Sequence, residues 1–199
     1  MVTPAGPPYS RRMQLESTKE GPMTTGVGHP VPDVVVDAYI RDATEPQPLS
    51  LAQYRGSWLV LVFYPRDFTF VCPTELQALA ALEPEFAASD AAVVAASTDS
   101  FYSHKAWFES DSRLRGAGYP VVADTAHELC QAFGVLLPDG AALRATFVID
   151  PNGIVRHATV SDLNVGRNIT ETLRVVQALQ TGELCPVNWR PGEPTLAAA

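Results

Sequence analysis

The sequence predicts an α/β fold in which a mixed central sheet is flanked by helices. A continuous run of β-branched and aromatic residues extends from Trp58 to Tyr64, which is typical of a central strand buried on both faces. Helical and strand patterns alternate along the chain. The turn Asp150-Pro-Asn-Gly153 separates two apolar runs and predicts a hairpin, so that one edge of the sheet is antiparallel.

The other elements follow from hydrophobic periodicity and from turn residues. Strands are predicted at residues 34–36, 91–97, 119–123, 145–149 and 154–159. Helices are predicted at residues 74–89, with a kink or end at Pro84, and at 100–109, 125–133 and 169–179. Gly134 closes the third of these helices. The Pro- and Gln-rich residues 42–50 receive no element.

Length and composition predict a single folded core with two appendages. The chain has 199 residues, of which 46% are hydrophobic and 18% charged, the balance of a globular protein. Residues 1–28 contain Pro and Gly without periodicity, so we expect a mobile N-terminal extension. Residues 29–180 form the predicted domain, and residues 181–199 form a Pro- and Gly-broken C-terminal tail.

Charge and hydropathy exclude several classes of partner. The net charge of -8 offers no basic surface for a nucleic acid or an anionic membrane. The longest apolar run has seven residues, far below the roughly 18 that a membrane span needs. The N-terminal region has no apolar stretch of signal-peptide length, so we expect a cytoplasmic protein. Three dispersed cysteines and scattered histidines predict neither a disulfide scaffold nor a metal site.

Cys72 is the residue whose position suggests chemistry. It follows a buried strand and precedes a helix expected to begin at Pro73 or Thr74, where unpaired backbone N–H groups and the helix dipole favour a thiolate. The Thr69 hydroxyl lies close enough in sequence to donate to and accept from an incoming oxygen. The alternative is that Cys72 fills the core as a small hydrophobic residue.

The segment from Phe63 to Glu75 resembles the active-site segment of the peroxiredoxins. Their pattern Pro-x-x-x-Thr-x-x-Cys is met by Pro65, Thr69 and Cys72. Three later segments also resemble, in order, the typical two-cysteine peroxiredoxins, and among them the peroxide-reducing component of bacterial alkyl hydroperoxide reductase: Ser97 to Trp107, Arg144 to Asp150 and Gly182 to Trp189. The resemblance spans residues 29–196 and implies a thioredoxin-like sandwich.

The resemblance implies a role for each matched residue. Cys72 becomes the peroxidatic cysteine, Thr69 and Arg144 bind the peroxide oxygens, and Pro65 shields the site. A hydroxyl and a guanidinium suit the charge that develops on a leaving oxygen. By position alone, Arg144 is a surface charge on a strand. Glu75 is either a favourable charge in the first helical turn or the group that orients an arginine.

The two remaining cysteines receive different interpretations. The resemblance makes Cys185 the resolving cysteine, which captures the Cys72 sulfenic acid as a disulfide between the subunits of a homodimer. By position alone, Cys185 is a structural residue near Trp189. Cys130 shares a predicted helix with Leu129 and Phe133 and matches no motif, so we expect it to fill the core.

The sequence thus predicts a thiol peroxidase that reduces hydrogen peroxide and organic hydroperoxides without a bound cofactor. No phosphate loop or dinucleotide fingerprint occurs, so electrons must come from an external dithiol. The reductant stays open between a thioredoxin-like protein and a flavoprotein-linked one, and the assembly between a dimer and a decameric ring. The rival functions are a general disulfide oxidoreductase, which favours two closely spaced cysteines, and a ring-forming holdase chaperone.

Overall fold

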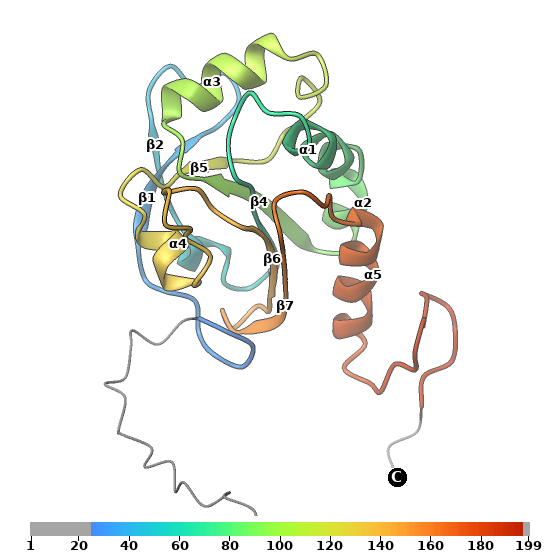
Figure 1. Ribbon diagram of the computed structural model, residues 1–199. Coiled ribbons are helices and arrows are strands. Elements are labelled where there is room, and N and C mark those ends of the chain that lie inside the picture. The colour runs from blue at the N-terminus through green and yellow to red at the C-terminus, as the bar shows by residue number, and fades with distance from the viewer. Residues whose placement is uncertain (1–24, 197–199) are drawn as a thin grey trace, which may run out of the picture.

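The computed structural model describes residues 25–196, and its strands form one seven-stranded mixed sheet (Figure 1). The strands are β1 (Val35–Tyr39), β2 (Gln47–Ser50), β3 (Trp58–Phe63), β4 (Ala91–Ser97), β5 (Val121–Ala123), β6 (Arg144–Ile149) and β7 (Val155–Ser161). The helices are α1 (Cys72–Ala81), α2 (Glu83–Ala88), α3 (Phe101–Ser110), α4 (Glu128–Ala132) and α5 (Ile169–Gln180), with a short 3-10 helix η1 (Leu51–Tyr54). The predicted fold class is confirmed.

The strand order is β2-β1-β5-β4-β3-β6-β7. The three central strands β5, β4 and β3 are parallel, and every other pair is antiparallel. The sequence predicts an antiparallel arrangement at one edge, whereas both edges have it, because β1 runs antiparallel to both β5 and β2. The hairpin between β6 and β7 forms as predicted, with the left-handed backbone of its turn supplied by Gly153.

The sheet is covered on both faces, as the apolar run at 58–64 requires. Helices α1, α2, α3 and α5 pack on one face, where Val60 and Val62 point into the core. The other face receives α4 and η1 against Leu59, Leu61 and Phe63. The alternation along β3 therefore serves two separate apolar clusters, which is why the run has no polar side.

Strand β2 is absent from the sequence prediction for a physical reason. It contains Pro48, which cannot donate a ladder hydrogen bond, and only Leu49 of its four residues is buried. A proline is tolerated here because β2 is the edge strand and pairs with β1 alone. The pattern of alternating apolar residues that identifies a half-buried strand is therefore missing.

Two predicted helices differ from the observed ones. The helix predicted at 74–89 is two helices separated at Leu82, and Pro84 lies in the first turn of α2, where its missing N–H has no intrahelical partner to lose. The helix predicted at 125–133 is only α4, because His127 has a left-handed backbone with φ of 63°. Asp124 caps α4 instead, accepting from the amides of Leu129 and Cys130 at 3.1 and 2.7 Å.

Most of the predicted extension at residues 1–28 lies outside the described residues. The part that is described is attached to the domain: the Thr25 amide donates to the Ala132 carbonyl at 2.7 Å, and the Gly28 amide donates to the Val155 carbonyl at 2.8 Å. Across residues 25–196, none of the helices has the length and apolar character needed to cross a membrane.

Candidate active site

Cys72 is the first residue of α1 and is fully buried. The helix begins one or two residues earlier than the sequence predicts, which places the sulfur itself in the first turn. Strand β3 and the loop 64–71 deliver it there. The Nη1 atom of Arg144 donates to the Cys72 sulfur at 3.4 Å, so a guanidinium stabilises negative charge on that atom.

Arg144 is buried, and its interpretation as a surface charge is wrong. It is the first residue of β6, which pairs with β3, the strand that leads into the Cys72 loop. Its side chain is 4% exposed. Besides the sulfur, Nη1 donates to Glu75 Oε2 at 2.7 Å, and Nε donates to the Leu163 carbonyl at 2.8 Å. These contacts fix the guanidinium against Cys72.

Glu75 lies between two arginines. Arg167 donates to it from its backbone amide and from Nε, both at 2.8 Å, and from Nη2 at 2.9 Å. Burial by itself raises the pKa of Glu75, but the hydrogen bonds and charge of Arg167, together with the charge of Arg144, outweigh burial and lower the pKa. A carboxylate is therefore present to hold Arg144. The sequence did not predict the role of Arg167, since no local pattern connects it to Glu75.

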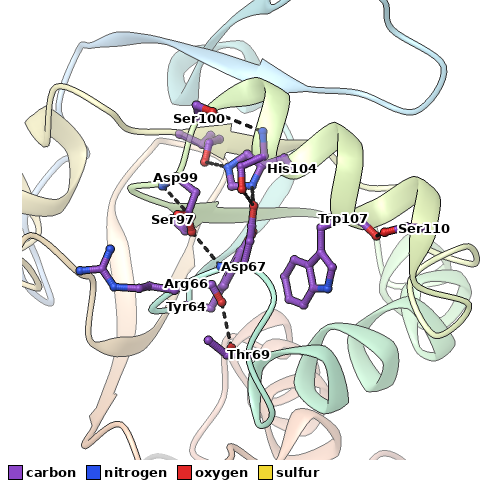
Figure 2. Close-up of polar contacts among 12 residues, drawn as sticks. Tyr64, Arg66, Asp67, Thr69, Ser97, Asp99, Ser100, His104, Trp107 and Ser110 are labelled. Carbon is purple, nitrogen blue, oxygen red and sulfur yellow. Dashed lines mark hydrogen bonds and ion pairs between the residues drawn. The ribbon is translucent and has the colours of Figure 1, made fainter.

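The loop between β3 and α1 carries the other two predicted residues. Pro65 is buried directly after Tyr64. Thr69 lies in the same loop, and its hydroxyl donates to the Arg66 carbonyl at 2.9 Å (Figure 2). Because the hydroxyl proton is committed to that carbonyl, the oxygen keeps its lone pairs for an incoming donor.

A buried polar cluster, which no local sequence pattern predicts, holds this loop against α3 (Figure 2). The Tyr64 hydroxyl donates to Asp67 Oδ1 at 2.8 Å, and the Ser103 hydroxyl donates to Asp67 Oδ2 at 2.8 Å. His104 is fully buried, and its Nδ1 lies 2.8 Å from the same Oδ2 while its Nε2 lies 3.1 Å from the Val122 carbonyl. Every polar atom of this cluster thus has a partner, which anchors the loop to the domain.

The other cysteines lie apart from this site. Cys185 is half-buried beyond the end of α5, with its sulfur 3.4 Å from the Thr181 hydroxyl and 3.6 Å from the Ala178 carbonyl. Cys130 is fully buried in the apolar cluster on the sheet face that α4 and η1 cover, as expected of a residue that fills the core. Burial, reinforced by the Asp124 carboxylate, raises the pKa of the Cys130 thiol well above its usual range. All three thiols are free.

The described residues contain no group of His, Cys, Asp and Glu arranged to hold a metal ion. What the site offers is a buried thiol at a helix start, a fixed guanidinium beside its sulfur and a hydroxyl in the preceding loop. Attack by the thiol on an electron-poor oxygen is the chemistry that such groups support. The class defined by this fold and site is a thiol-dependent redox enzyme.

Comparisons with known proteins agree with that class. The model of the AhpC/TSA family matches residues 27–158, and the model of the C-terminal domain of 1-Cys peroxiredoxin matches residues 178–199. The thioredoxin peroxidase of Trypanosoma brucei rhodesiense is 44% identical over 180 residues, covering 86% of this chain and 90% of the relative.

Solved structures give the same result. The reduced 2-Cys peroxiredoxin of Plasmodium vivax superposes with a TM-score of 0.81 at 33% identity, covering 85% of this chain and 91% of that one. Mycobacterium tuberculosis AhpC superposes with a TM-score of 0.77 at 38% identity, covering 84% of this chain and 100% of that one. The chain therefore belongs to the AhpC/TSA family and is a peroxiredoxin of the typical two-cysteine type, similar to AhpC. It is an enzyme that reduces peroxides with a thiol.

Proposed function

We propose that Cys72 is the peroxidatic cysteine and that the cycle begins with its attack on a hydroperoxide. The thiolate sulfur bonds to one peroxide oxygen, the O–O bond breaks, and the sulfur is oxidised to a sulfenic acid. The second oxygen leaves with the bonding electron pair and takes a proton, giving water or an alcohol. The observation that carries this assignment is the contact of 3.4 Å between Arg144 Nη1 and the Cys72 sulfur.

The neighbouring residues receive roles that follow from their contacts. Arg144 stabilises the thiolate and then the charge on the leaving oxygen, because its guanidinium is already oriented before the substrate arrives. Glu75 holds Arg144 in that orientation. The Thr69 oxygen accepts the peroxide O–H, since its own proton is donated to Arg66. Pro65 carries no N–H and forms part of the wall that keeps water from the sulfur.

We propose that Cys185 of a second subunit resolves the sulfenic acid. Within one chain, Arg167 contacts Glu75 just before α5 begins, whereas the Cys185 sulfur lies beside Ala178 near the end of that helix. From residue 169 to residue 178 the helix advances by nine steps of about 1.5 Å, or about 14 Å in all, yet a disulfide needs its sulfurs about 2 Å apart. In Figure 1 the tail leaves α5 at the end opposite to its contact with the site. A homodimer, alone or in a decameric ring, supplies a resolving thiol without unfolding α5.

The remainder of the cycle uses an external reductant. The Cys185 thiol displaces water from the Cys72 sulfenic acid to form the disulfide, and a dithiol then reduces that disulfide while becoming oxidised itself. We propose a thioredoxin-like or flavoprotein-linked dithiol protein, in the reducing environment of the cytoplasm. In this scheme residues 29–180 are the peroxidase domain and residues 181–199 are the tail that carries the resolving cysteine.

Non-reducing electrophoresis before and after one equivalent of peroxide tests the proposal. The wild-type chain should convert to a covalent dimer. Cys72→Ser should neither consume peroxide nor dimerise, and Cys185→Ser should react once with peroxide and stay monomeric. Cys130→Ser is the matched control and should behave like the wild type. Peroxide consumption by Cys72→Ser, or a disulfide mapped within one chain, would contradict the corresponding step.

A further inference from the structure

We propose that Asp99 is a positioning residue of the active site, which acts on Thr69 through a single peptide group. The proposal rests on the role given to Thr69 above and extends the site to a carboxylate in the segment from Ser97 to Trp107, to which the resemblance gave no role. Asp99 lies just after β4, and its carboxylate contacts the loop that precedes Cys72 (Figure 2).

The Asp99 carboxylate is itself fixed by the end of β4. Ser97 is the last residue of that strand and is fully buried. Its hydroxyl donates to Asp99 Oδ2 at 3.0 Å, and the Asp99 amide donates back to the Ser97 hydroxyl oxygen at 3.0 Å. The position of Oδ2 is therefore set by one of the three central parallel strands, a rigid part of the sheet.

One peptide group connects this carboxylate to Thr69. The Asp67 amide donates to Asp99 Oδ2 at 2.8 Å, and the Arg66 carbonyl accepts from the Thr69 hydroxyl at 2.9 Å. The amide and the carbonyl are the two ends of the same planar unit, so fixing one end fixes the other. Donation to a carboxylate also polarises the peptide group and makes its carbonyl a stronger acceptor. Asp99 thus sets the direction of the Thr69 hydroxyl and commits its proton.

Phe68, which lies between Asp67 and Thr69, shows why this loop needs to be held in place. It has a left-handed backbone with φ of 54°, a conformation that side chains bearing a Cβ rarely adopt. Its side chain is 61% exposed, and its ring lies 5.8 Å from that of Trp107. A strained residue persists where its surroundings hold it. Without Asp99, we expect Phe68 to relax and to rotate Thr69 away from the peroxide.

The test compares two reactions of the same sulfur. Asp99→Ala should lower the second-order rate of Cys72 oxidation by hydrogen peroxide by about tenfold, because the Thr69 oxygen is no longer in place. Alkylation of Cys72 by iodoacetamide depends on the thiolate but not on the Thr69 oxygen, so its rate should change less than about twofold. Asp99→Asn keeps an oxygen acceptor without the charge and should restore part of the peroxide rate. It also serves if Asp99→Ala fails to fold.

Two further variants separate positioning from general damage. If Asp99 acts through Thr69, hydrogen peroxide should oxidise Cys72 no more slowly in the double variant with Thr69→Val and Asp99→Asn than in Thr69→Val alone. Asp150→Asn removes another carboxylate that caps backbone amides, at the far end of β6, and should leave the peroxide rate unchanged.

The outcomes distinguish this inference from the proposed function. A wild-type peroxide rate in both Asp99 variants, an additive loss in the double variant, or an equal fall of the oxidation and alkylation rates would overturn the role of Asp99. Full activity of Thr69→Val would overturn the role of Thr69 and this inference with it. Peroxidase activity in Cys72→Ser would instead overturn the proposed function itself.

Discussion

Replacing Arg144 with alanine should slow peroxide reduction by at least tenfold, with a central expectation near a hundredfold. Two unit charges at the 3.4 Å between Nη1 and the Cys72 sulfur interact by about 5 kcal/mol at an effective dielectric constant of about 20. The Glu75 carboxylate, 2.7 Å from the same nitrogen, offsets part of this attraction. A lost transition-state donor costs about 2.7 to 4 kcal/mol, which corresponds to a rate loss of about a hundredfold to a thousandfold.

Stopped-flow oxidation by hydrogen peroxide, paired with alkylation by iodoacetamide at neutral pH, measures this effect. Both reactions of Arg144→Ala should slow, because thiolate stabilisation and donation to the leaving oxygen are lost together. Arg144→Lys keeps the charge without the planar fork and should recover alkylation better than peroxide reduction. Arg156→Ala is the control, since this arginine pairs with Asp150 at the far end of the sheet. Wild-type rates for both reactions of Arg144→Ala would refute the reasoning.

Three more predictions follow from the contacts of buried residues. Glu75 has a lowered pKa in the folded protein, so it contributes stability above its ordinary pKa of about 4.3 that is lost as the pH falls through the folded-state value. In urea unfolding, Glu75→Gln should have a lower free energy of unfolding than the wild type, and this difference should shrink below about pH 4. A difference that does not change with pH would contradict this pKa shift. Arg167→Ala removes the main partner of the buried Glu75 carboxylate, which should lower the free energy of unfolding by about 3 to 5 kcal/mol. The melting temperature of this variant should therefore fall by about 6 to 20 °C. A shift under 2 °C in calorimetry would show that the pair is dispensable. Cys130 is fully buried with a raised pKa, so it should resist alkylation until the protein unfolds, and labelling of Cys130 in native protein would count against its place in the core.

Local sequence patterns predicted most elements of this fold, because their information lies within a few residues. The apolar run at 58–64 became β3, and the turn before Gly153 became the hairpin between β6 and β7. Edge strand β2 was missed because its residues bury one side chain only. The helix predicted at 125–133 is longer than α4, because no neighbouring residue indicates that the backbone of His127 is left-handed.

The sequence by itself determined the segment that bears Cys72. Pro65, Thr69 and Cys72 lie within eight positions, and a buried strand followed by a helix start is a local pattern. The same holds for Cys130, whose apolar helical neighbours predicted its burial.

Only the tertiary structure decided which charged groups lie around Cys72 and the loop that precedes it. Arg144 reaches Cys72 because β6 pairs with β3, and Arg167 reaches Glu75 because the chain returns past α1 after β7. Asp99 contacts the Cys72 loop because β4 lies beside β3 in the sheet. These contacts join residues far apart in sequence, so each is apparent only once the fold brings its two partners together. A lone charged residue in a sequence is interpreted as exposed, since burial of a charge is costly until its partner is known.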